Sequence, residues 1–419
     1  ILGASYRREG SSKFAKDNRW GNFWAVNAGW RISNEAFMEN VEWVTDLKLR
    51  AGYGVTGNND FSSSYSANLL GSDTRWMLPN GQWAYSYGKS QNINPNLGWE
   101  EKGEWNIGLD WALFGGRLHG KFDIFRRKIT DMLFSVKVPQ PPYTQDSQWQ
   151  NIGEMESKGW EFEIGGDIIR NKNFTWTTNL NLSHTSGKIL TLYGDNTYIN
   201  GNGFPAPGSP GDASRIEAGA EIGSFYLWKF AGFDEEGCFL VYDKDGNVIP
   251  ANDKSNDDKQ YMGNYTPKLI LGWNHTFQYK NFDLGINMRS WIDFDVYNTL
   301  DMYYGIQGKG DINVLKSAYS KYNHIKGEKM LCDYWLQDGT FLKIDAITLG
   351  YTLDAKKFSN KMIDRIRIYG TVGNVCTITG YDGMNPEVNV TGWDQGTERF
   401  WSGFYPVVRT YTLGMQFNF

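Results

Sequence analysis

The sequence has few of the residues that build metal centres, disulfide scaffolds or membrane-spanning helices. Its three cysteines, Cys238, Cys332 and Cys376, lie far apart and form no CxxC pair, so they allow at most one disulfide and offer no zinc spacing. No uncharged apolar run approaches the roughly 18 to 20 residues that a membrane-spanning helix requires. The net charge of −5 excludes the basic surface that a nucleic-acid-binding protein needs.

Catalytic motifs are missing as well. The sequence contains no GxSxG, P-loop or HExxH motif, and its four histidines stand at no metal-ligand spacing. The acidic pairs Glu100 with Glu101 and Glu161 with Glu163 lie near turns of strand-like segments, where they line a lumen more readily than they form the carboxylate pair of a glycosidase. We therefore expect no enzymatic activity and no organic cofactor.

One short segment has the oxygen spacing that opens a calcium-binding loop. Asp243, Asp245 and Asn247 stand at positions x, x+2 and x+4, but the bidentate glutamate that an EF-hand requires does not follow them. A polar turn with Gly246 in the left-handed conformation explains the same residues. Calcium stays open as an alternative to the simple turn.

Glycine and aromatic residues are abundant, and both favour strands and turns. The chain has 48 Gly, 18 Trp, 24 Tyr and 24 Phe among 419 residues. Large apolar residues occupy every second position in several segments, among them 105–113, 160–168 and 282–288, while charged and small residues fill the alternate positions. In and directly after the third segment, the alternate, polar positions include Asp283, Asn287 and Arg289. Segments of about 9 to 11 residues with this alternation are typical of tilted membrane strands, whose mean hydropathy is low because one face is polar.

Short and long connections between these segments alternate along the chain, as they do in outer-membrane barrels. The sequence predicts about twelve crossings, and it predicts that the stretch 188–267 contributes none, its strand-like parts forming an extracellular hairpin. The predicted crossings are 1–8, 20–32, 45–56, 101–113, 117–131, 160–170, 174–185, 269–279, 282–292, 341–353, 364–376 and 406–419. The predicted long extracellular loops are 57–98, 134–155, 188–267, 295–339 and 378–405.

The chain begins inside strand-like sequence, with Ile1 and without a signal peptide, which we interpret as a piece of a longer barrel. An open sheet in lipid would expose two unpaired edges, so a companion segment is expected. A soluble β-sandwich, lectin or propeller is the alternative. Tryptophan and tyrosine near the segment ends and charges on the opposite face favour the membrane barrel.

Blocks spread over the whole chain resemble the C-terminal half of SusC/RagA-like TonB-dependent outer-membrane transporters of Bacteroidota. The resemblance rests on long blocks of sequence near both ends and in the middle. These blocks are 4–14, 18–21, 28–33, 47–58, 94–100, 125–133, 151–161 and 403–414.

This resemblance implies an all-β fold, in which the chain forms about 12 C-terminal strands of a transmembrane antiparallel barrel of 22 strands, and in which residues 1–419 are one portion of a single barrel domain. The plug that fills such a barrel would lie outside this chain.

The implied activity is nutrient uptake across the outer membrane, with glycans or oligopeptides imported by energy from the TonB complex. The implied partners are a SusD-like surface lipoprotein that acts as a lid, the N-terminal barrel and plug segment, and outer-membrane lipid. A passive porin and a soluble carbohydrate-binding β-protein remain the alternatives.

The long loops contain the candidate substrate contacts, because aromatic faces stack on sugar rings and peptide side chains while Asp and Arg supply directional hydrogen bonds. Taken singly, each of these residues is better explained by packing within a loop or by contact with a lid, and as a set they are expected to include some substrate contacts. The candidates are Trp76, Trp83, Tyr87, Trp149, Tyr303, Tyr304, Trp335, Asp338, Trp393, Arg399 and Trp401.

Overall fold

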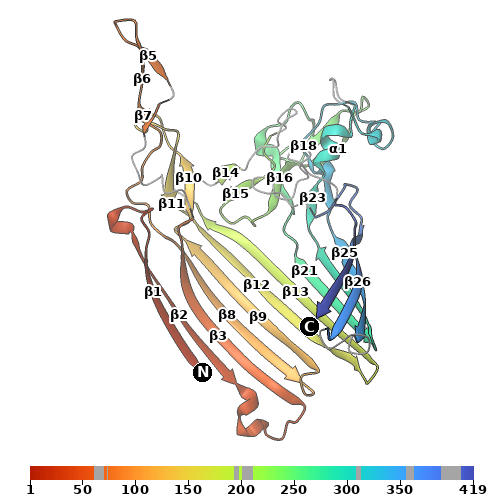
Figure 1. Cartoon of the computed structure of the whole chain (residues 1–419). Helices are drawn as coiled ribbons and strands as arrows, with labels where there is room; N and C mark the ends of the chain where they lie inside the picture. The colour runs from red at the N-terminus through yellow and green to blue at the C-terminus, as the bar shows by residue number, and fades with distance from the viewer. Residues whose placement is uncertain are drawn as a thin grey trace.

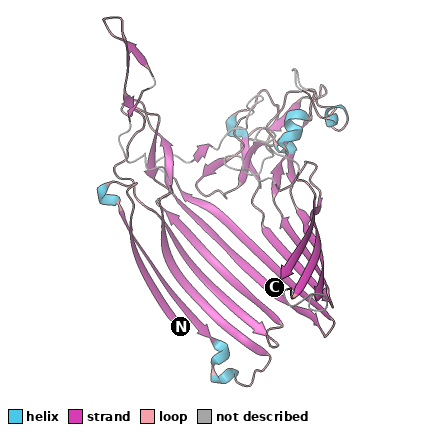
Figure 2. Cartoon of the chain, in the orientation of Figure 1, coloured by secondary structure: helices cyan, strands magenta, loops and turns pink. Residues whose placement is uncertain are grey.

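Twelve antiparallel strands form one curved sheet, in which strands that follow each other in the sheet also follow each other along the chain (Figure 1). The computed structural model describes residues 1–60, 70–72, 74–192, 198–200, 211–307, 313–354, 363–387 and 407–419. Strands dominate the described residues (Figure 2). The one α-helix among these residues, α1 (Thr299–Tyr304), lies in a long connection, and the other helical turns are short 3-10 helices. No helix in this part of the chain is both long and apolar enough to cross a membrane.

Each predicted crossing corresponds to one strand of the sheet, and these strands pair in the order in which they occur along the chain. The prediction that 188–267 contributes no crossing is confirmed, because β13 pairs directly with β21. The strands are β1 (Leu2–Gly10), β2 (Trp20–Arg31), β3 (Val44–Asn58), β8 (Glu100–Leu113), β9 (Leu118–Thr130), β12 (Glu154–Arg170), β13 (Phe174–Thr191), β21 (Leu269–Tyr279), β22 (Phe282–Ile292), β25 (Phe341–Asp354), β26 (Arg365–Thr379) and β27 (Thr410–Asn418).

The strand register gives the sheet one apolar face and one polar face. Leu109 on β8 pairs with Leu49 and Phe122, and Phe122 pairs with Phe162, so a row of large apolar side chains crosses four strands. Because side chains alternate between the two faces, the neighbouring residues point the other way and make up the polar face.

Large side chains on the apolar face are open to the surroundings. Trp30 is 49% exposed, Leu349 is 54% exposed and Leu413 is 82% exposed. A β-sandwich would cover such residues with a second sheet. The exposure of this face therefore fits a surface that meets hydrocarbon and contradicts the soluble-sandwich alternative.

The sheet has two unpaired edges among the described residues. β1 pairs only with β2, and β27 pairs only with β26. Unpaired backbone groups at a sheet edge cannot be satisfied by lipid. That further strands complete the sheet stays a prediction.

At one end of the sheet, tight turns connect β8 with β9, β12 with β13 and β21 with β22. Between β8 and β9 the chain reverses through Phe114, Gly115 and Gly116, which all have positive φ, at 54°, 69° and 82°. Glycine adopts these values without steric cost. Between β12 and β13 the Asn171 side chain accepts a hydrogen bond from the Phe174 backbone N–H at 2.9 Å. Local turn chemistry thus fixes the register of both hairpins.

The other end of the sheet, which we call the long-loop end, carries small accessory sheets (Figure 1). The predicted hairpin within 188–267 is partly wrong: β17 pairs with β18, but β16 pairs with β20. The accessory strands are β4 (Leu70–Gly71), β5 (Arg75–Met77), β6 (Trp83–Tyr85), β7 (Gly88–Lys89), β10 (Leu133–Lys137), β11 (Ser147–Asn151), β14 (Tyr198–Asn200), β15 (Arg215–Glu217), β16 (Ser224–Trp228), β17 (Phe230–Phe233), β18 (Phe239–Tyr242), β19 (Val248–Pro250), β20 (Lys259–Asn264), β23 (Asp295–Tyr297) and β24 (Leu336–Asp338).

Of the hydrophobic clusters formed by the described residues, the largest lies in these loops and not in the sheet. The connection between β13 and β21 and the connection between β22 and β25 share one cluster, the loop core, which includes Leu227, Val241, Tyr297 and Trp335. A hydrogen bond of 2.6 Å from the Phe230 backbone N–H to the Asp333 carboxylate joins the two connections. The loops therefore fold as a packed unit of their own at the long-loop end.

Candidate functional site

Ion pairs cover the polar face of the sheet. Arg50 on β3 donates to Asp110 on β8 at 2.8 Å and to Asp123 on β9 at 3.0 Å. Gly108 lies between these partners, where a Cβ atom would come within 2.3 Å of the Asp123 carboxylate and 2.5 Å of the Arg50 guanidinium. A glycine is therefore needed at this position to let the charged groups meet across β8.

The same pattern continues along the sheet. Lys121 pairs with Glu163 at 3.1 Å, and Asn179 donates to the same carboxylate at 3.3 Å. Arg367 on β26 donates to Asp283 on β22 at 2.9 Å. Paired charges that stay partly exposed are stable next to water, while the same groups would be costly in hydrocarbon. This face is suited to lining a water-filled passage.

A charged cluster joins the polar face to the last long connection at the long-loop end. Arg289 on β22 and Lys343 on β25 are paired positions of neighbouring strands. Both contact Glu387, which follows β26, and Arg289 also binds Asp345 at 2.9 Å. We call these four residues the Glu387 cluster.

Two titratable side chains, Lys259 and Asp301, are largely buried in the loops at the long-loop end. Burial lowers the pKa of Lys259 to about 8, and its ammonium group donates to the Asp212 carbonyl at 2.7 Å beside the Trp228 ring. Burial likewise raises the pKa of Asp301, which accepts a hydrogen bond of 2.9 Å from the Tyr322 hydroxyl. These groups are satisfied inside the loops, so their role is structural.

Three predicted substrate contacts lie on a protruding part of the long-loop end. Trp76, Trp83 and Tyr87 are 70%, 65% and 68% exposed. The first two belong to the hairpin of β5 and β6, which extends away from the sheet (Figure 1). Trp83 pairs with Met77 and Trp76 pairs with Ala84, so the two indoles lie on opposite faces of the hairpin. They are free to contact another molecule, although they do not form one pocket.

The structure buries three other candidates. Tyr303, Tyr304 and Trp335 are only 5%, 8% and 1% exposed and belong to the loop core. The Trp335 indole N–H donates to the Met330 carbonyl at 3.1 Å. The expectation that these residues contact substrate directly does not fit this burial, and loop packing explains their aromatic character.

The remaining candidates are dispersed. Trp149 on β11 is partly buried and packs against the cluster of Phe14, Phe23, Leu97 and Trp99. Asp338 is exposed at the end of β24, and its carboxylate accepts a hydrogen bond from the Thr340 backbone N–H at 2.8 Å. Trp393, Arg399 and Trp401 lie outside the described residues.

The segment with calcium-like spacing forms a hydrogen-bonded turn. The Asp243 carboxylate accepts bonds from the backbone N–H groups of Asp245 at 2.9 Å and Asn247 at 2.8 Å, and from the Asn247 side chain at 2.9 Å. These bonds lower the pKa of Asp243. Within the described residues, no group of three acidic, histidine or cysteine side chains is arranged to hold a metal ion.

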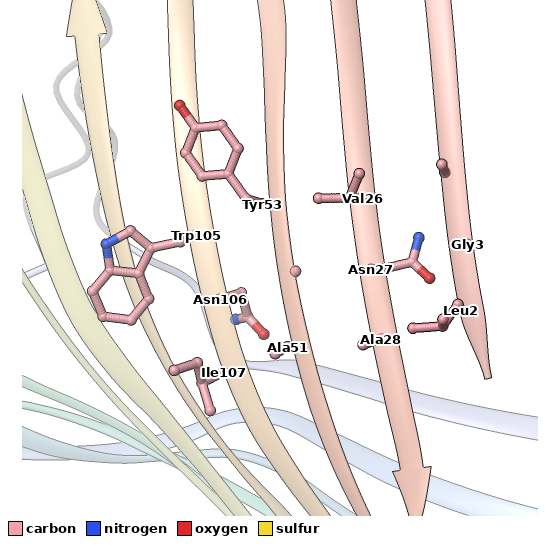
Figure 3. Close-up of a pocket in the computed structure, with 12 residues that line it drawn as sticks. Leu2, Gly3, Val26, Asn27, Ala28, Ala51, Tyr53, Trp105, Asn106 and Ile107 are labelled. Atoms are coloured by element: carbon pink, nitrogen blue, oxygen red, sulfur yellow. The ribbon is translucent and has the colours of Figure 1, made fainter.

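A groove of about 760 Å³ crosses the apolar face near β1 (Figure 3). Its floor includes the small residues Ala28 and Ala51, while Tyr53, Trp105 and Ile107 form one wall. Most of its lining residues belong to the apolar face by strand register. The groove therefore belongs to the hydrocarbon-facing surface and is not a site for a polar cargo.

Sequence reasoning missed the Glu387 cluster as a site. Alternation along β22 placed Arg289 on the polar face, and that signal was available from the sequence. The partner Glu387 lies in an irregular segment 98 residues away, where no periodicity points to a contact.

The family model and the curated relatives that match this chain are all TonB-dependent receptors. A family model described as TonB dependent receptor-like, beta-barrel, matches residues 1–289. TonB-dependent receptor SusC of Bacteroides thetaiotaomicron is 32% identical over 437 residues, covering 99% of this chain and 41% of SusC. TonB-dependent receptor P3 of Formosa agariphila is 30% identical over 451 residues, covering 99% of this chain and 43% of the receptor. The chain spans less than half the length of these curated relatives.

The fold has matches among solved structures. The structure of the RagAB peptide transporter aligns with a TM-score of 0.82 and 25% identity, covering 99% of this chain and 45% of that chain. The 'open-open' state of the RagAB peptide importer aligns with the same TM-score at 24% identity, covering 100% of this chain and 45% of that chain. The twelve-stranded sheet and the loops at its long-loop end thus follow an arrangement seen in a solved transporter.

Proposed function

The chain belongs to the TonB-dependent receptor-like β-barrel family, a family of outer-membrane proteins, and from that premise we propose that it is the C-terminal barrel portion of an active nutrient importer. In this proposal the polar face lines the lumen, the apolar face meets lipid and the long-loop end faces the outside of the cell. The remaining strands and the plug belong to a preceding segment of the same transporter.

The observation that supports this proposal most strongly is the contrast between the two faces of one sheet. Ion pairs such as Arg50 with Asp110 and Lys121 with Glu163 extend over the polar face. Leu349 and Leu413, on the opposite face, are exposed. A sheet with charges on one face and exposed leucines on the other separates water from hydrocarbon.

The cargo class we propose is a glycan or an oligopeptide. SusC, the relative at 32% identity, and RagAB, which is described as a peptide transporter, support an importer of nutrients. A polar, ion-paired wall suits either class, because both present many hydrogen-bonding groups. Energy would come from the TonB complex through the part of the transporter that precedes this chain.

We further propose that a SusD-like surface lipoprotein covers the long-loop end as a lid. The packed loop core offers a firm base for such a partner, and the exposed residues Trp76, Trp83 and Tyr87 offer aromatic contacts of the kind that anchor protein interfaces. In this interpretation these three residues bind the lid or cargo held under it.

Uptake measurements test active import. Cells that express the complete transporter are given fluorescent maltooligosaccharides or a fluorescent peptide digest, with and without a protonophore. The proposal predicts uptake of one cargo class that stops when the proton gradient is collapsed. Uptake that continues without the gradient would instead support a passive porin, and an absence of uptake of both classes would contradict nutrient import of the proposed cargo.

A further inference from the structure

The Glu387 cluster differs from the other ion pairs of the polar face in how its charges are distributed. The two cations, Arg289 and Lys343, belong to the sheet, whereas the carboxylate of Glu387 comes from the connection after β26. Arg50, Lys121 and Arg367, in contrast, pair with carboxylates on strands of the sheet. The Glu387 contact is therefore one that the chain can release without unpairing any strand.

Lys343 and Glu387 are the buried members of the cluster, and the Glu387 carboxylate contacts both cations. The Lys343 side chain is 6% exposed and the Glu387 side chain is 12% exposed, and the Lys343 ammonium group lies 3.1 Å from the carboxylate. The Arg289 guanidinium donates to the same carboxylate at 2.8 Å. The two cations hold the Glu387 carboxylate by charge-assisted hydrogen bonds, and Arg289 also binds Asp345. A buried lysine of this kind is destabilising without an anion beside it.

Local interactions hold Glu387 in this position. The Asn385 side-chain oxygen accepts a hydrogen bond from the Glu387 backbone N–H at 3.2 Å, which shapes a tight turn. Tyr381 is 5% exposed and packs with Phe294, Val296 and Phe341 near the start of β25. The segment from Tyr381 to Glu387 is thus folded against the polar face.

A second contact ties the same segment to the loop core. Asp382 accepts a hydrogen bond from the Lys321 ammonium group at 2.6 Å, and its backbone N–H donates to the Gln337 side chain at 3.0 Å. Lys321 and Gln337 belong to the connection between β22 and β25. A rearrangement of the loops would therefore move Glu387 relative to Arg289 and Lys343.

From this geometry we propose that Arg289 and Lys343 form a carboxylate-binding site on the lumen wall, which Glu387 fills as an internal ligand until a carboxylate group of the cargo displaces it. This inference rests on the proposed import function. The ligand class is an oligomer that bears carboxylates, either an acidic peptide or a uronic-acid glycan. Arg289 is 38% exposed at its side chain, so an incoming carboxylate can reach it before Glu387 leaves.

An internal ligand competes with an external one. The apparent affinity for the external ligand equals the intrinsic affinity multiplied by the fraction of time that the site is empty. If Glu387 fills the site nine-tenths of the time or more, its removal raises the affinity for a carboxylate-bearing ligand about tenfold or more. Glu387→Gln removes the negative charge and keeps the size and hydrogen-bonding capacity of the side chain. Arg289→Gln with Lys343→Met removes the site itself.

Binding is measured by calorimetry on the purified complete transporter in detergent, without any energy source. The probes are tetraglutamate with its neutral counterpart tetraglutamine, and tetragalacturonate with its neutral counterpart maltotetraose. We expect Glu387→Gln to bind at least one of the two acidic probes about tenfold more tightly than the unchanged protein and the neutral probes equally. We expect the double variant to lose the preference for acidic probes. Tighter binding of tetraglutamate identifies the ligand as an acidic peptide, and tighter binding of tetragalacturonate identifies it as a uronic-acid glycan.

Asp283→Asn serves as the matched control, because Asp283 also neutralises an arginine on the polar face but does so from within the sheet. It should leave the preference for acidic probes unchanged. Retained heat modifiability on gels shows that each variant keeps its barrel. The proposal is overturned if folded Glu387→Gln binds both acidic probes no more tightly than the unchanged protein. Because the assay needs no transport, a failure of active import would leave this result standing, and the reverse also holds.

Discussion

Arg50 and Asp123 are bound to each other at 3.0 Å although a whole strand, β8, separates the strands that carry them. They meet above Gly108, which has no side chain to keep them apart. The contact shows that the polar face is an organised layer and not a loose collection of solvated charges. Its glycines are part of that organisation.

Gly108→Ala should therefore destabilise the barrel, because the added methyl group would collide with both partners of the ion pair. We expect a loss of about 1 to 3 kcal/mol, seen as a lower temperature for heat modification of the complete transporter. Gly285→Ala is the matched control, since Gly285 also lies on the polar face and a Cβ there meets nothing within 4 Å. Equal effects of the two substitutions would contradict this explanation.

The two faces of β22 should respond differently to the same charge. Ile286 lies on the apolar face, in the middle of the strand, and Asn287 beside it lies on the polar face and is exposed. Ile286→Arg should cost about 2 to 4 kcal/mol and reduce the amount of assembled barrel, whereas Asn287→Arg should assemble normally. Quantification of heat-modifiable protein in outer membranes measures both. Normal assembly of Ile286→Arg would show that this face does not meet hydrocarbon.

The stability of the loop core should rise with pH between about 8 and 10.5. Burial lowers the pKa of Lys259 from 10.5 to about 8, so in this range the unfolded loops bind a proton that the folded loops do not. Stability then increases with pH, by at most about 3 kcal/mol over the whole range. Hydrogen exchange of residues 224–264 measures this slope. Lys259→Met should flatten it, and an identical slope in the variant would rule out Lys259 as its source.

The buried thiol of Cys332 should report on the same unit. Cys332 is fully buried, and burial raises its pKa to about 12, so it should resist maleimide at pH 8. Cys238, which is partly exposed, should react faster. Mass spectrometry of labelled peptides separates the two sites. Rapid labelling of both cysteines in the native protein would mean that the loop core is open in solution.

The sequence predicts those features of the structure that depend on residues close together in the chain, and it predicts poorly those that depend on contacts between distant segments. The alternation in 105–113 and 282–288 is local, so it predicted the strands and the face to which each side chain belongs. The pairing of β16 with β20 was missed, because a closer segment offered an equally good partner. Trp335 illustrates the limit for loops: an irregular segment has no period, so its aromatic residues give no sign of whether they are buried or exposed.

In the candidate site, too, the residues on strands were predictable and the contacts made by loops were not. Arg289 was placed on the polar face by its strand, but Glu387 became its partner only through the fold of a distant connection. Trp76 and Trp83 were correctly located in a long loop, and their place on a protruding hairpin could not be derived from composition. Residues of regular strands were therefore predictable, and contacts between long loops were not.

The central claim is that one face of the sheet meets hydrocarbon while the other meets water, and a label scan along β22 tests it most directly. Spin labels are placed one at a time at positions 284 to 288 of the complete transporter in lipid, and their accessibility to oxygen and to a water-soluble nickel complex is compared. The account predicts that 284, 286 and 288 are open to oxygen and shielded from nickel, with the opposite result at 285 and 287. Equal access of the nickel complex to both sets of positions would contradict it.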